Sequence, residues 1–208
     1  MNKKTRILIV DDHFLLRIGL ATSLNSEADL TVVAEAGTGA QALELYRKHQ
    51  PDIVLMDLRL PDMGGDQTAA ALCKEFPKAK VIMISSFDGQ DDIYRSLQAG
   101  ARSYLPKNVL RDELLRAIRA VQAGENYLPP TVAARLVQRM HAPELSAREA
   151  EVLKLVVDGL TNKEIAQSLA ITEITVKNHV SSILTKLNAT DRTQASTIAI
   201  QRGIVHLD

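Results

Sequence analysis

The stretch Asp52-Ile53-Val54-Leu55-Met56-Asp57 places four apolar residues in a row between Pro51 and a loop rich in Gly and Pro, residues 58–65. A short apolar run bounded by turn residues predicts a strand that is buried on both faces, as in a parallel sheet. Packing gives such a strand no reason to end in a carboxylate. Asp57 nevertheless stands at that end, where open α/β sheets bind ligands. The alternative is that Asp57 only caps a helix or a turn.

Further apolar runs in the first half predict more strands, and a helical pattern follows each of them. The predicted strands are residues 7–10, 30–36, 52–57, 80–85 and 102–105. The predicted helices are residues 14–24, 38–49, 66–76, 88–99 and 111–123. Strands that alternate with helices predict a parallel, doubly wound α/β sheet. The sequence does not fix the strand order; in the flavodoxin-like order 2-1-3-4-5, the first and third strands flank the switch point.

Polar side chains follow several of these strands. Asp11 and Asp12 end the first strand, Asp57 ends the third, Ser85 ends the fourth, and Lys107 follows the fifth. Three carboxylates brought together repel one another unless a cation lies among them, and oxygen ligands suit Mg²⁺. An ammonium group and a hydroxyl complete a site that can hold a phosphoryl group.

Length and composition are those of an ordinary globular protein. The 208 residues suggest one large domain or two smaller ones, with 46% hydrophobic and only 3% aromatic residues. Up to Gly124 there are 16 acidic and 16 basic residues, and nine of each follow it. Bulk charge therefore gives no indication of nucleic-acid binding, which has to be argued from local placement.

Nothing in the sequence predicts a membrane or secretory segment. No apolar run approaches the ~18 residues that span a bilayer, and residues 1–6 do not lead into a signal-peptide core. The single cysteine, Cys73, excludes an internal disulfide and fits the apolar side of a predicted helix. We expect a cytoplasmic protein without a membrane partner.

The first half resembles the receiver domain of two-component response regulators, over residues 5–124. The resemblance rests on Asp11-Asp12, Asp57, the loop 59–65, Ser85, Gly100-Ala101, Tyr104 and Lys107. The resemblance implies a flavodoxin-like, five-stranded parallel sheet. Receivers accept a phosphoryl group from a phosphohistidine of a sensor histidine kinase.

The resemblance also implies a role for each site residue. Asp57 would be the phosphoacceptor, and Mg²⁺ would be bound by Asp12, Asp57 and the backbone carbonyl of Arg59, with Asp11 acting mostly through water. Lys107 would pair with phosphoryl oxygens, Ser85 would hydrogen-bond one of them, and Tyr104 would change rotamer with Ser85. The chain would then be no enzyme beyond its own phosphorylation and dephosphorylation. A haloacid-dehalogenase-like phosphotransferase is the rival class, but it requires an Asp-x-Asp motif, and Leu58-Arg59 follow Asp57.

A proline-bounded segment, residues 125–142, joins the two halves. Pro130 fits the first turn of a short helix over residues 131–140. This helix is either a semi-rigid connector or a last layer packed on the first domain, and both interpretations stay open.

The second half, residues 143–208, predicts an all-α domain of four helices. Ser146 and Glu149 match a capping box, and Thr161 and Glu164 repeat it. The second helix ends in a tight turn at 170–171, and a longer helix follows from Thr172 to about residue 188. The pattern indicates a helix-turn-helix, although similar helix pairs occur in domains that bind no DNA.

The longer helix has two different faces. Val176, Val180, Ile183, Leu184 and Leu187 form an apolar stripe. The opposite side carries short or hydrogen-bonding side chains and almost no acid, which suits contact with base edges. The candidate DNA contacts are Lys177, Asn178, Ser181, Thr175 and Glu173 on this helix, with Lys163 and Lys186 placed for phosphates.

This half resembles the LuxR-type helix-turn-helix output domain, and the whole chain is similar to NarL/FixJ-type response regulators. The resemblance rests on residues 145–149, 151–153, 159–166, 175–180, 184–187 and 192–195. It implies a homodimer on double-stranded promoter DNA, with a dimer contact through Ala195, Ile198 and Ala199. We expect a transcription factor in which phosphorylation of Asp57 controls dimerisation and DNA binding. The alternative is a phosphorylation-independent regulator whose receiver serves only as an interaction module.

Overall fold

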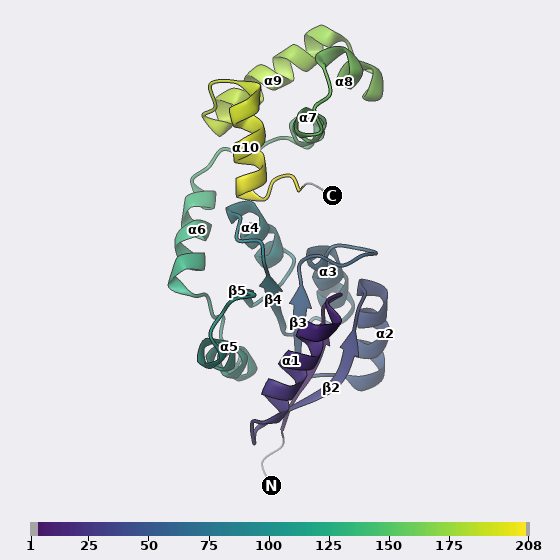
Figure 1. Cartoon of the computed structure of the whole chain (residues 1–208), viewed down its shortest axis with the longest axis vertical. Coiled ribbons are helices and arrows are strands. Elements are labelled where there is room, and N and C mark those ends of the chain that lie inside the picture. The colour runs from purple at the N-terminus through teal and green to yellow at the C-terminus, as the bar shows by residue number, and fades with distance from the viewer. Residues whose placement is uncertain (1–3, 207–208) are drawn as a thin grey trace. The chain divides into compact units, whose positions relative to one another are not determined.

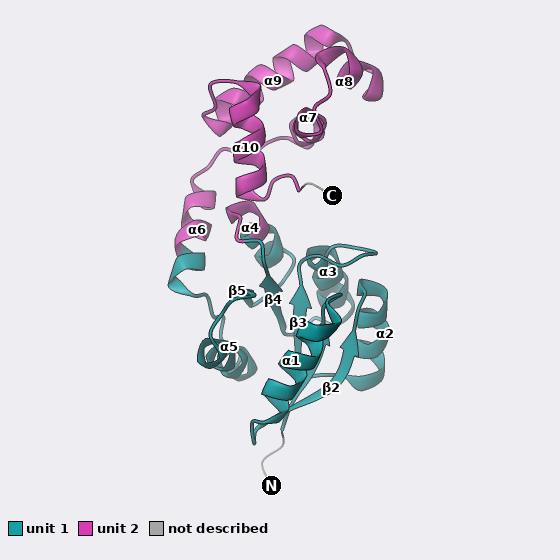
Figure 2. Ribbon diagram, viewed as in Figure 1, with its two compact units in different colours: residues 1–87, 93–133 teal, residues 88–92, 134–208 magenta. Residues whose placement is uncertain are grey.

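The computed structural model describes residues 4–206 and divides them into two compact units. Of these residues, 4–87 and 93–133 belong to one unit, and 88–92 and 134–206 belong to the other (Figure 2). The division at residues 133 and 134 falls between the predicted domain boundaries at 124 and 143, which stay predictions. Along residues 4–206, no helix combines the length and apolar character that crossing a membrane requires.

A parallel sheet of five strands forms the first unit, and its order is β2-β1-β3-β4-β5 (Figure 1). The strands are β1 (Thr5–Val10), β2 (Leu30–Ala36), β3 (Ile53–Asp57), β4 (Val81–Ser85) and β5 (Ser103–Pro106). The helices are α1 (Phe14–Asn25), α2 (Gly39–His49), α3 (Gly65–Glu75), α4 (Gln90–Gln98) and α5 (Arg111–Ala123). The predicted doubly wound fold is confirmed, and the flavodoxin-like order that the sequence left open is the one observed.

The register places the carboxyl ends of the central strands side by side. Val10 of β1 pairs with Met56 of β3, Asp57 pairs with Ile84 of β4, and Ser85 pairs with Pro106 of β5. The residues that follow these strands therefore meet at one edge of the sheet. This edge holds the candidate site.

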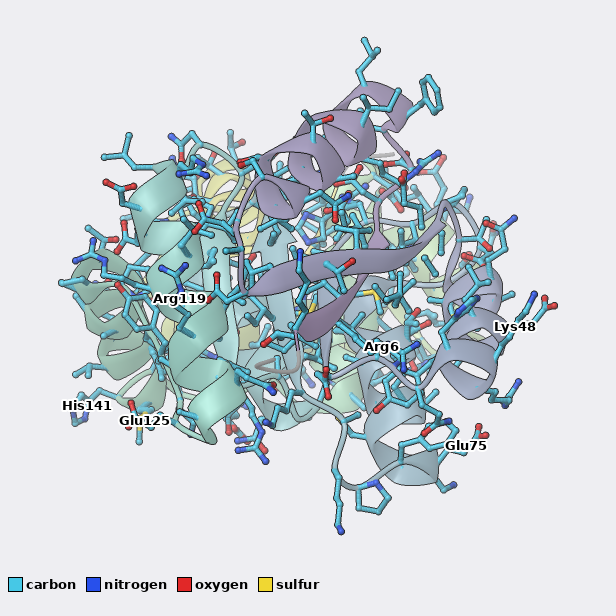
Figure 3. The ribbon with its side chains drawn as sticks, turned by 90° about the horizontal axis from the view of Figure 1, so that it is seen from below. Arg6, Lys48, Glu75, Arg119, Glu125 and His141 are labelled. Atoms are coloured by element: carbon cyan, nitrogen blue, oxygen red, sulfur yellow. The ribbon has the colours of Figure 1, made fainter. Side chains whose placement is uncertain are left out.

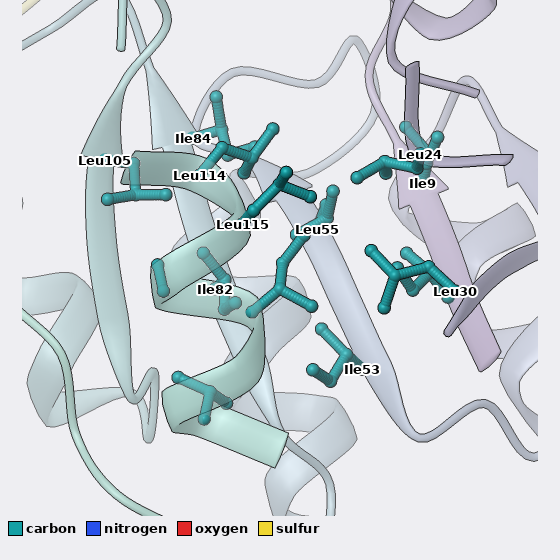
Figure 4. Close-up of a cluster of buried hydrophobic side chains, with 14 residues drawn as sticks. Ile9, Leu24, Leu30, Ile53, Leu55, Ile82, Ile84, Leu105, Leu114 and Leu115 are labelled. Carbon is teal, nitrogen blue, oxygen red and sulfur yellow. The ribbon is translucent and has the colours of Figure 1, made fainter. Parts of the chain in front are cut away.

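Apolar side chains from alternate strand positions form the core against α1 and α5 (Figure 4). Ile9, Leu55 and Ile84 lie on this face, together with Leu24 of α1 and Leu115 of α5. Intervening strand residues such as Val54 and Met56 are fully buried as well, because helices also cover the other face. Burial on both faces explains the uninterrupted apolar runs in the sequence.

Charged side chains on the outside of the first unit tie α5 to the loop before β2. Arg119 of α5 is labelled in Figure 3. It donates to both carboxylate oxygens of Asp29, at 2.9 and 3.0 Å, and to Glu27 at 2.8 Å. Arg119 and Asp29 are well exposed, so their pair adds little to stability. The strand β3 begins one residue later than predicted, at Ile53, and the side chain of Asp52 instead accepts a hydrogen bond from the Arg6 amide.

Helices make up the rest of the chain. α6 (Pro130–Met140) begins in the first unit and continues into the second. The remaining helices are α7 (Ala147–Val157), α8 (Asn162–Ser168), α9 (Glu173–Leu187) and α10 (Arg192–Arg202). Both predicted capping boxes are present, at the starts of α7 and α8. The apolar sides of α7–α10 meet in a second core, which contains Leu153, Ile165, Val176 and Ile183.

Candidate functional site

Asp57 and Asp11 meet at the end of the sheet, and Lys107 lies between them. The Lys107 ammonium is 2.7 Å from Oδ2 of Asp57 and 2.8 Å from Oδ2 of Asp11. Only 4% of Asp57 and 2% of Asp11 are exposed. Two buried carboxylates and one ammonium leave this edge with a net negative charge that a cation or a proton can compensate.

The electrostatics of the three groups follow from this geometry. Burial raises the pKa of Asp57, and the Asp11 carboxylate raises it further, although the hydrogen bond from Lys107 opposes both effects. Burial acts to lower the pKa of Lys107, but its hydrogen bonds to Asp11 and Asp57 outweigh burial and raise that pKa. Lys107 is therefore held as a cation beside the carboxylate that it contacts.

Asp12 and His13 complete an open rim around the buried pair. Ligand atoms of Asp11, Asp12, His13 and Asp57 all lie within 4.8 Å of one another. The carboxylate oxygens in this cluster are the donors that Mg²⁺ prefers, so these residues fit the predicted ion. The role predicted for the Arg59 carbonyl stays a prediction.

His13 was not among the predicted site residues. Its Nδ1 lies 2.7 Å from Asp12 and 3.1 Å from Asp11, and its backbone amide donates to Asp11 at 2.8 Å. His13 precedes the first residue of α1, so the turn that starts this helix also orients Asp11. Its position directly after the two aspartates was the only available signal in the sequence.

Ser85 and Tyr104 both contact the backbone of Phe87. The Ser85 hydroxyl accepts from the Phe87 amide at 2.9 Å, and the Tyr104 hydroxyl donates to the Phe87 carbonyl at 2.6 Å. Ser85 is fully buried and Tyr104 is 1% exposed. The two residues predicted to move together are therefore joined through one loop residue after β4.

Gly65, at the start of α3, allows the helix to approach the end of β3. A Cβ atom at this position would lie 1.9 Å from the carbonyl oxygen of Asp57, so no larger residue fits without a shift. The Gly65 amide also donates to the Leu58 carbonyl at 2.7 Å. The backbone around Asp57 is thus held by a contact that only glycine permits.

The candidate base contacts Lys177, Asn178 and Ser181 lie on the polar side of α9, which we call the reading face. Lys177, Asn178 and Ser181 are exposed, whereas Val176 and Ile183 on the opposite side are buried. The turn before α9 contains Ala170 in the left-handed region, with a φ of 52°. The helix thus packs through its apolar stripe and leaves its polar side to solvent.

The other predicted DNA contacts lie in different environments. Glu173 and Lys163 are exposed, and the Thr175 hydroxyl is paired with that of Thr172 at 2.9 Å. Lys186 is engaged within the unit, 2.7 Å from Oε2 of Glu149. Ile174 is 71% exposed beside the reading face.

The predicted dimer residues of α10 divide into two groups. Ala195 is 1% exposed and Ala199 is fully buried, because both belong to the core of their own unit. Ile198 is partly buried against the same core. The dimer contact stays a prediction for all three residues.

Family models match both halves of the chain. Residues 7–119 match the response regulator receiver domain, and residues 143–199 match the bacterial regulatory proteins of the luxR family. A receiver joined to a LuxR-type helix-turn-helix defines a class of transcription regulators and not of catalytic enzymes.

Several relatives are similar to this protein over nearly the whole chain. The transcriptional regulatory protein LiaR of Bacillus subtilis is 39% identical, over 97% of this chain and 99% of that protein. The response regulator VraR of Staphylococcus aureus is 38% identical, over 96% and 98% of the two chains. The crystal structure of the response regulator ChrA is similar with a TM-score of 0.59 and 35% identity, covering 97% of this chain and 99% of that one. The protein belongs to the NarL/FixJ-type two-component response regulators.

Proposed function

We propose that this response regulator accepts a phosphoryl group on Asp57 from a sensor histidine kinase, and that this group controls its dimerisation and its sequence-specific binding to promoter DNA. The observation that carries the proposal is the position of Lys107, within 2.8 Å of both buried carboxylates. An ammonium group held at that point can neutralise phosphoryl oxygens as they arrive.

The proposed transfer is a displacement at phosphorus. An oxygen of the Asp57 carboxylate attacks the phosphoryl group, the nitrogen–phosphorus bond of the phosphohistidine breaks, and the imidazole leaves with that electron pair. Asp12, Asp57 and the Arg59 carbonyl are the proposed holders of Mg²⁺, with Asp11 acting through water. When bound, the ion would neutralise charge on the phosphoryl oxygens.

The proposed switch involves Ser85 and Tyr104. In the structure, the Ser85 hydroxyl accepts from the Phe87 amide at 2.9 Å. A phosphoryl group of about −2 charge on Asp57 would attract this hydroxyl. When Ser85 turns away, the Phe87 backbone loses a partner and Tyr104 moves with it. Coupling between separate phosphate and DNA sites typically amounts to about 1–3 kcal/mol, which corresponds to a population shift and not to a new fold.

The proposed output is a homodimer on a near-palindromic site, with half-sites about one helical turn apart. Lys177, Asn178 and Ser181 are the proposed base readers, because they are exposed on the polar side of α9. Lys163, exposed on α8, is the proposed phosphate contact. Glu173 and Thr175 stand at the start of α9 and would approach DNA at the edge of this face.

A labelling experiment tests the phosphoacceptor. With Mg²⁺ and a small phosphodonor, the wild type should gain one phosphoryl group and Asp57→Asn should gain none. Asp62→Asn is the matched control, since Asp62 is an exposed carboxylate in the next loop, where it accepts from the Gly39 and Ala40 amides. Equal labelling of wild type and Asp57→Asn would refute the assignment.

A salt titration of DNA binding tests the output face. Lys177→Ala should lose discrimination between target and scrambled DNA. Lys163→Ala should weaken binding to both and lower the slope of log K against log salt by about one unit. Identical behaviour of the two variants would contradict the assignment of Lys177 to base edges.

The second candidate function is a DNA-binding regulator whose receiver is never phosphorylated. The engagement of Ser85 and Tyr104 with Phe87 favours the phosphorylated mechanism, since this network joins the predicted switch residues. Failure of the wild type to label, with DNA binding intact, would favour the alternative. The cytoplasmic location stays a prediction under either function.

A further inference from the structure

The carboxylate of Glu149, at the start of α7, accepts hydrogen bonds from three other residues. Its Oε2 accepts from the Ser146 amide at 2.6 Å and from the Lys186 ammonium at 2.7 Å, and its Oε1 accepts from the Ser182 hydroxyl at 2.6 Å. Glu149 is only 5% exposed. Both oxygens are therefore satisfied, and two of the three partners lie on α9.

The second capping box shows how unusual this arrangement is. Glu164 occupies the same position at the start of α8, and its carboxylate accepts hydrogen bonds from the amide and the hydroxyl of Thr161, each at 2.7 Å. Glu164 is exposed. Capping a helix therefore requires neither burial nor a contact to another helix, so capping alone does not account for Glu149.

Ser182 and Lys186 are four residues apart, which places them one turn apart along a single row of α9. Contact with two points on a row fixes both the rotation of the helix about its axis and its shift along that axis. Asn178, a proposed base reader, stands one turn earlier on the same row.

Reading base edges requires that α9 be placed precisely. Side-chain tips lie about 5–6 Å from a helix axis, so a rotation of about 20° moves them by about 2 Å. A hydrogen bond to a base edge tolerates only a few tenths of an ångström around its distance of about 2.9 Å. A small rotation of α9 would therefore remove readout while leaving contact with the phosphates.

We propose that Glu149 is a positioning residue for DNA recognition, which fixes the rotation and axial position of α9 through Ser182 and Lys186. In this proposal Lys186 pairs with Glu149 and does not contact a DNA phosphate. Hydrogen bonds from Lys186 and Ser182 outweigh the effect of burial and hold the Glu149 pKa at about 2, so the contact is ionised at neutral pH. The proposal rests on the reading face assigned to α9 under the proposed function.

The test compares two identical substitutions in the full chain. Glu149→Gln can still form a capping box, because Gln is accepted there, but it loses the charge that holds Lys186. The matched control is Glu164→Gln in the exposed box. The readout is the ratio of affinities for a duplex selected from random DNA by the wild type and for a scrambled duplex of equal length.

Glu149→Gln should lower this ratio by about tenfold or more, the discrimination of a good base contact, with binding to scrambled DNA unchanged. Glu164→Gln should stay within about twofold of the wild type, since it leaves α9 untouched. Equal ratios for the two variants would overturn the proposal. A purely structural role would change thermal stability and would leave the ratio unchanged well below the melting temperature.

Substitution of Lys186 provides the second measurement. Lys186→Met should reduce the ratio as Glu149→Gln does and leave the salt slope unchanged, whereas Lys163→Met should lower the slope by about one unit. A slope lowered by Lys186→Met at an unchanged ratio would make Lys186 a phosphate contact and overturn the proposal.

Two further variants separate the possible failures. If Glu149→Gln does not fold, Ser182→Ala removes one neutral partner without leaving a buried charge unpaired, and it should still lower the ratio. An unchanged ratio in Ser182→Ala would then overturn the proposal. A lowered ratio in Glu149→Gln but not in Lys177→Ala would refute the assignment of Lys177 to base edges and leave the positioning role of Glu149 intact.

Discussion

The guanidinium carbon of Arg59 lies 4.7 Å from the centroid of the Phe87 ring. Arg59 follows β3 by two residues and Phe87 follows β4 by two, so this stack joins the loop that follows Asp57 to the loop that follows the neighbouring strand. The Phe87 backbone also holds Ser85 and Tyr104. One contact thus links a loop next to the phosphoacceptor with the residues of the proposed switch.

Arg59→Ala should shorten the lifetime of the phosphoryl group on Asp57, because water gains access when the two loops separate. A cation–π contact at an exposed site is worth about 0.5–1 kcal/mol, which corresponds to about a two- to fivefold faster loss. The measurement is the decay of label after removal of the phosphodonor. Arg47→Ala, which breaks the Arg47–Glu75 pair elsewhere in the unit, should decay like the wild type. An unchanged or longer lifetime in Arg59→Ala would contradict this role.

Gly65→Ala should destabilise the first unit and slow phosphorylation of Asp57. The added Cβ would lie 1.9 Å from the Asp57 carbonyl oxygen, and overpacking of this kind costs about 1–3 kcal/mol. Gly19→Ala is the control, since nothing lies within 4 Å of its Cβ position in α1 and a helical alanine stabilises by about 0.5–1 kcal/mol. Thermal unfolding should shift in opposite directions for the two variants. A shift in the same direction would contradict the close approach at Gly65.

Ala170→Gly should stabilise the helix-turn-helix or leave it unchanged. Ala170 has a φ of 52°, and the left-handed conformation costs an L-residue about 1–2 kcal/mol that glycine avoids. Part of this gain is offset by the greater freedom of glycine in the unfolded chain. Ala150→Gly, inside α7, should instead destabilise by about 1 kcal/mol. Thermal unfolding followed through amide signals of α9 distinguishes the two, and destabilisation by Ala170→Gly would exclude strain at this turn.

Stability of the second unit should depend on the ionisation of Glu149. Its pKa is about 2, against an ordinary value of 4.5, because hydrogen bonds from Lys186 and Ser182 outweigh burial. A lowered pKa means that the unfolded chain binds the proton first as pH falls. The stabilisation, up to about 3 kcal/mol, is therefore present above pH 4.5 and is lost as pH falls toward 2.

The measurement is the difference in melting temperature between wild type and Glu149→Gln, followed through α9 signals at pH 6 and at pH 3. The difference should be large at pH 6 and should shrink at pH 3. A difference independent of pH would show that the Glu149 carboxylate gains nothing from its partners.

Local patterns were sufficient to predict the sheet and the meeting of Asp11, Asp57 and Lys107 at its edge. Apolar runs ending in Asp11 and Asp57 reveal buried strands, and parallel strands bring their ends to one edge without any knowledge of side-chain contacts. The amphipathic pattern of α9 likewise separated the buried Val176 from the exposed Lys177.

Contacts between distant residues could not be predicted in this way. Lys186 lies 37 residues from Glu149 in the sequence. Helical periodicity places a lysine on the polar side of a helix, but it does not indicate whether that lysine pairs with a buried carboxylate. Ala195 and Ala199 are small enough to suit either a core or an interface, and only the packing of α10 assigns them to the core. The stack of Arg59 on Phe87 depends on two loops whose conformations no periodic pattern describes.

The most direct measurement is DNA affinity with and without phosphorylation, made on the full chain with a duplex selected from random DNA. Treatment with Mg²⁺ and a small phosphodonor should raise the affinity of the wild type by about 5- to 150-fold, the usual range for coupling between two sites. Asp57→Asn should bind equally before and after treatment. Equal affinities for the phosphorylated and unphosphorylated wild type, or the same rise in Asp57→Asn, would contradict control of DNA binding through Asp57.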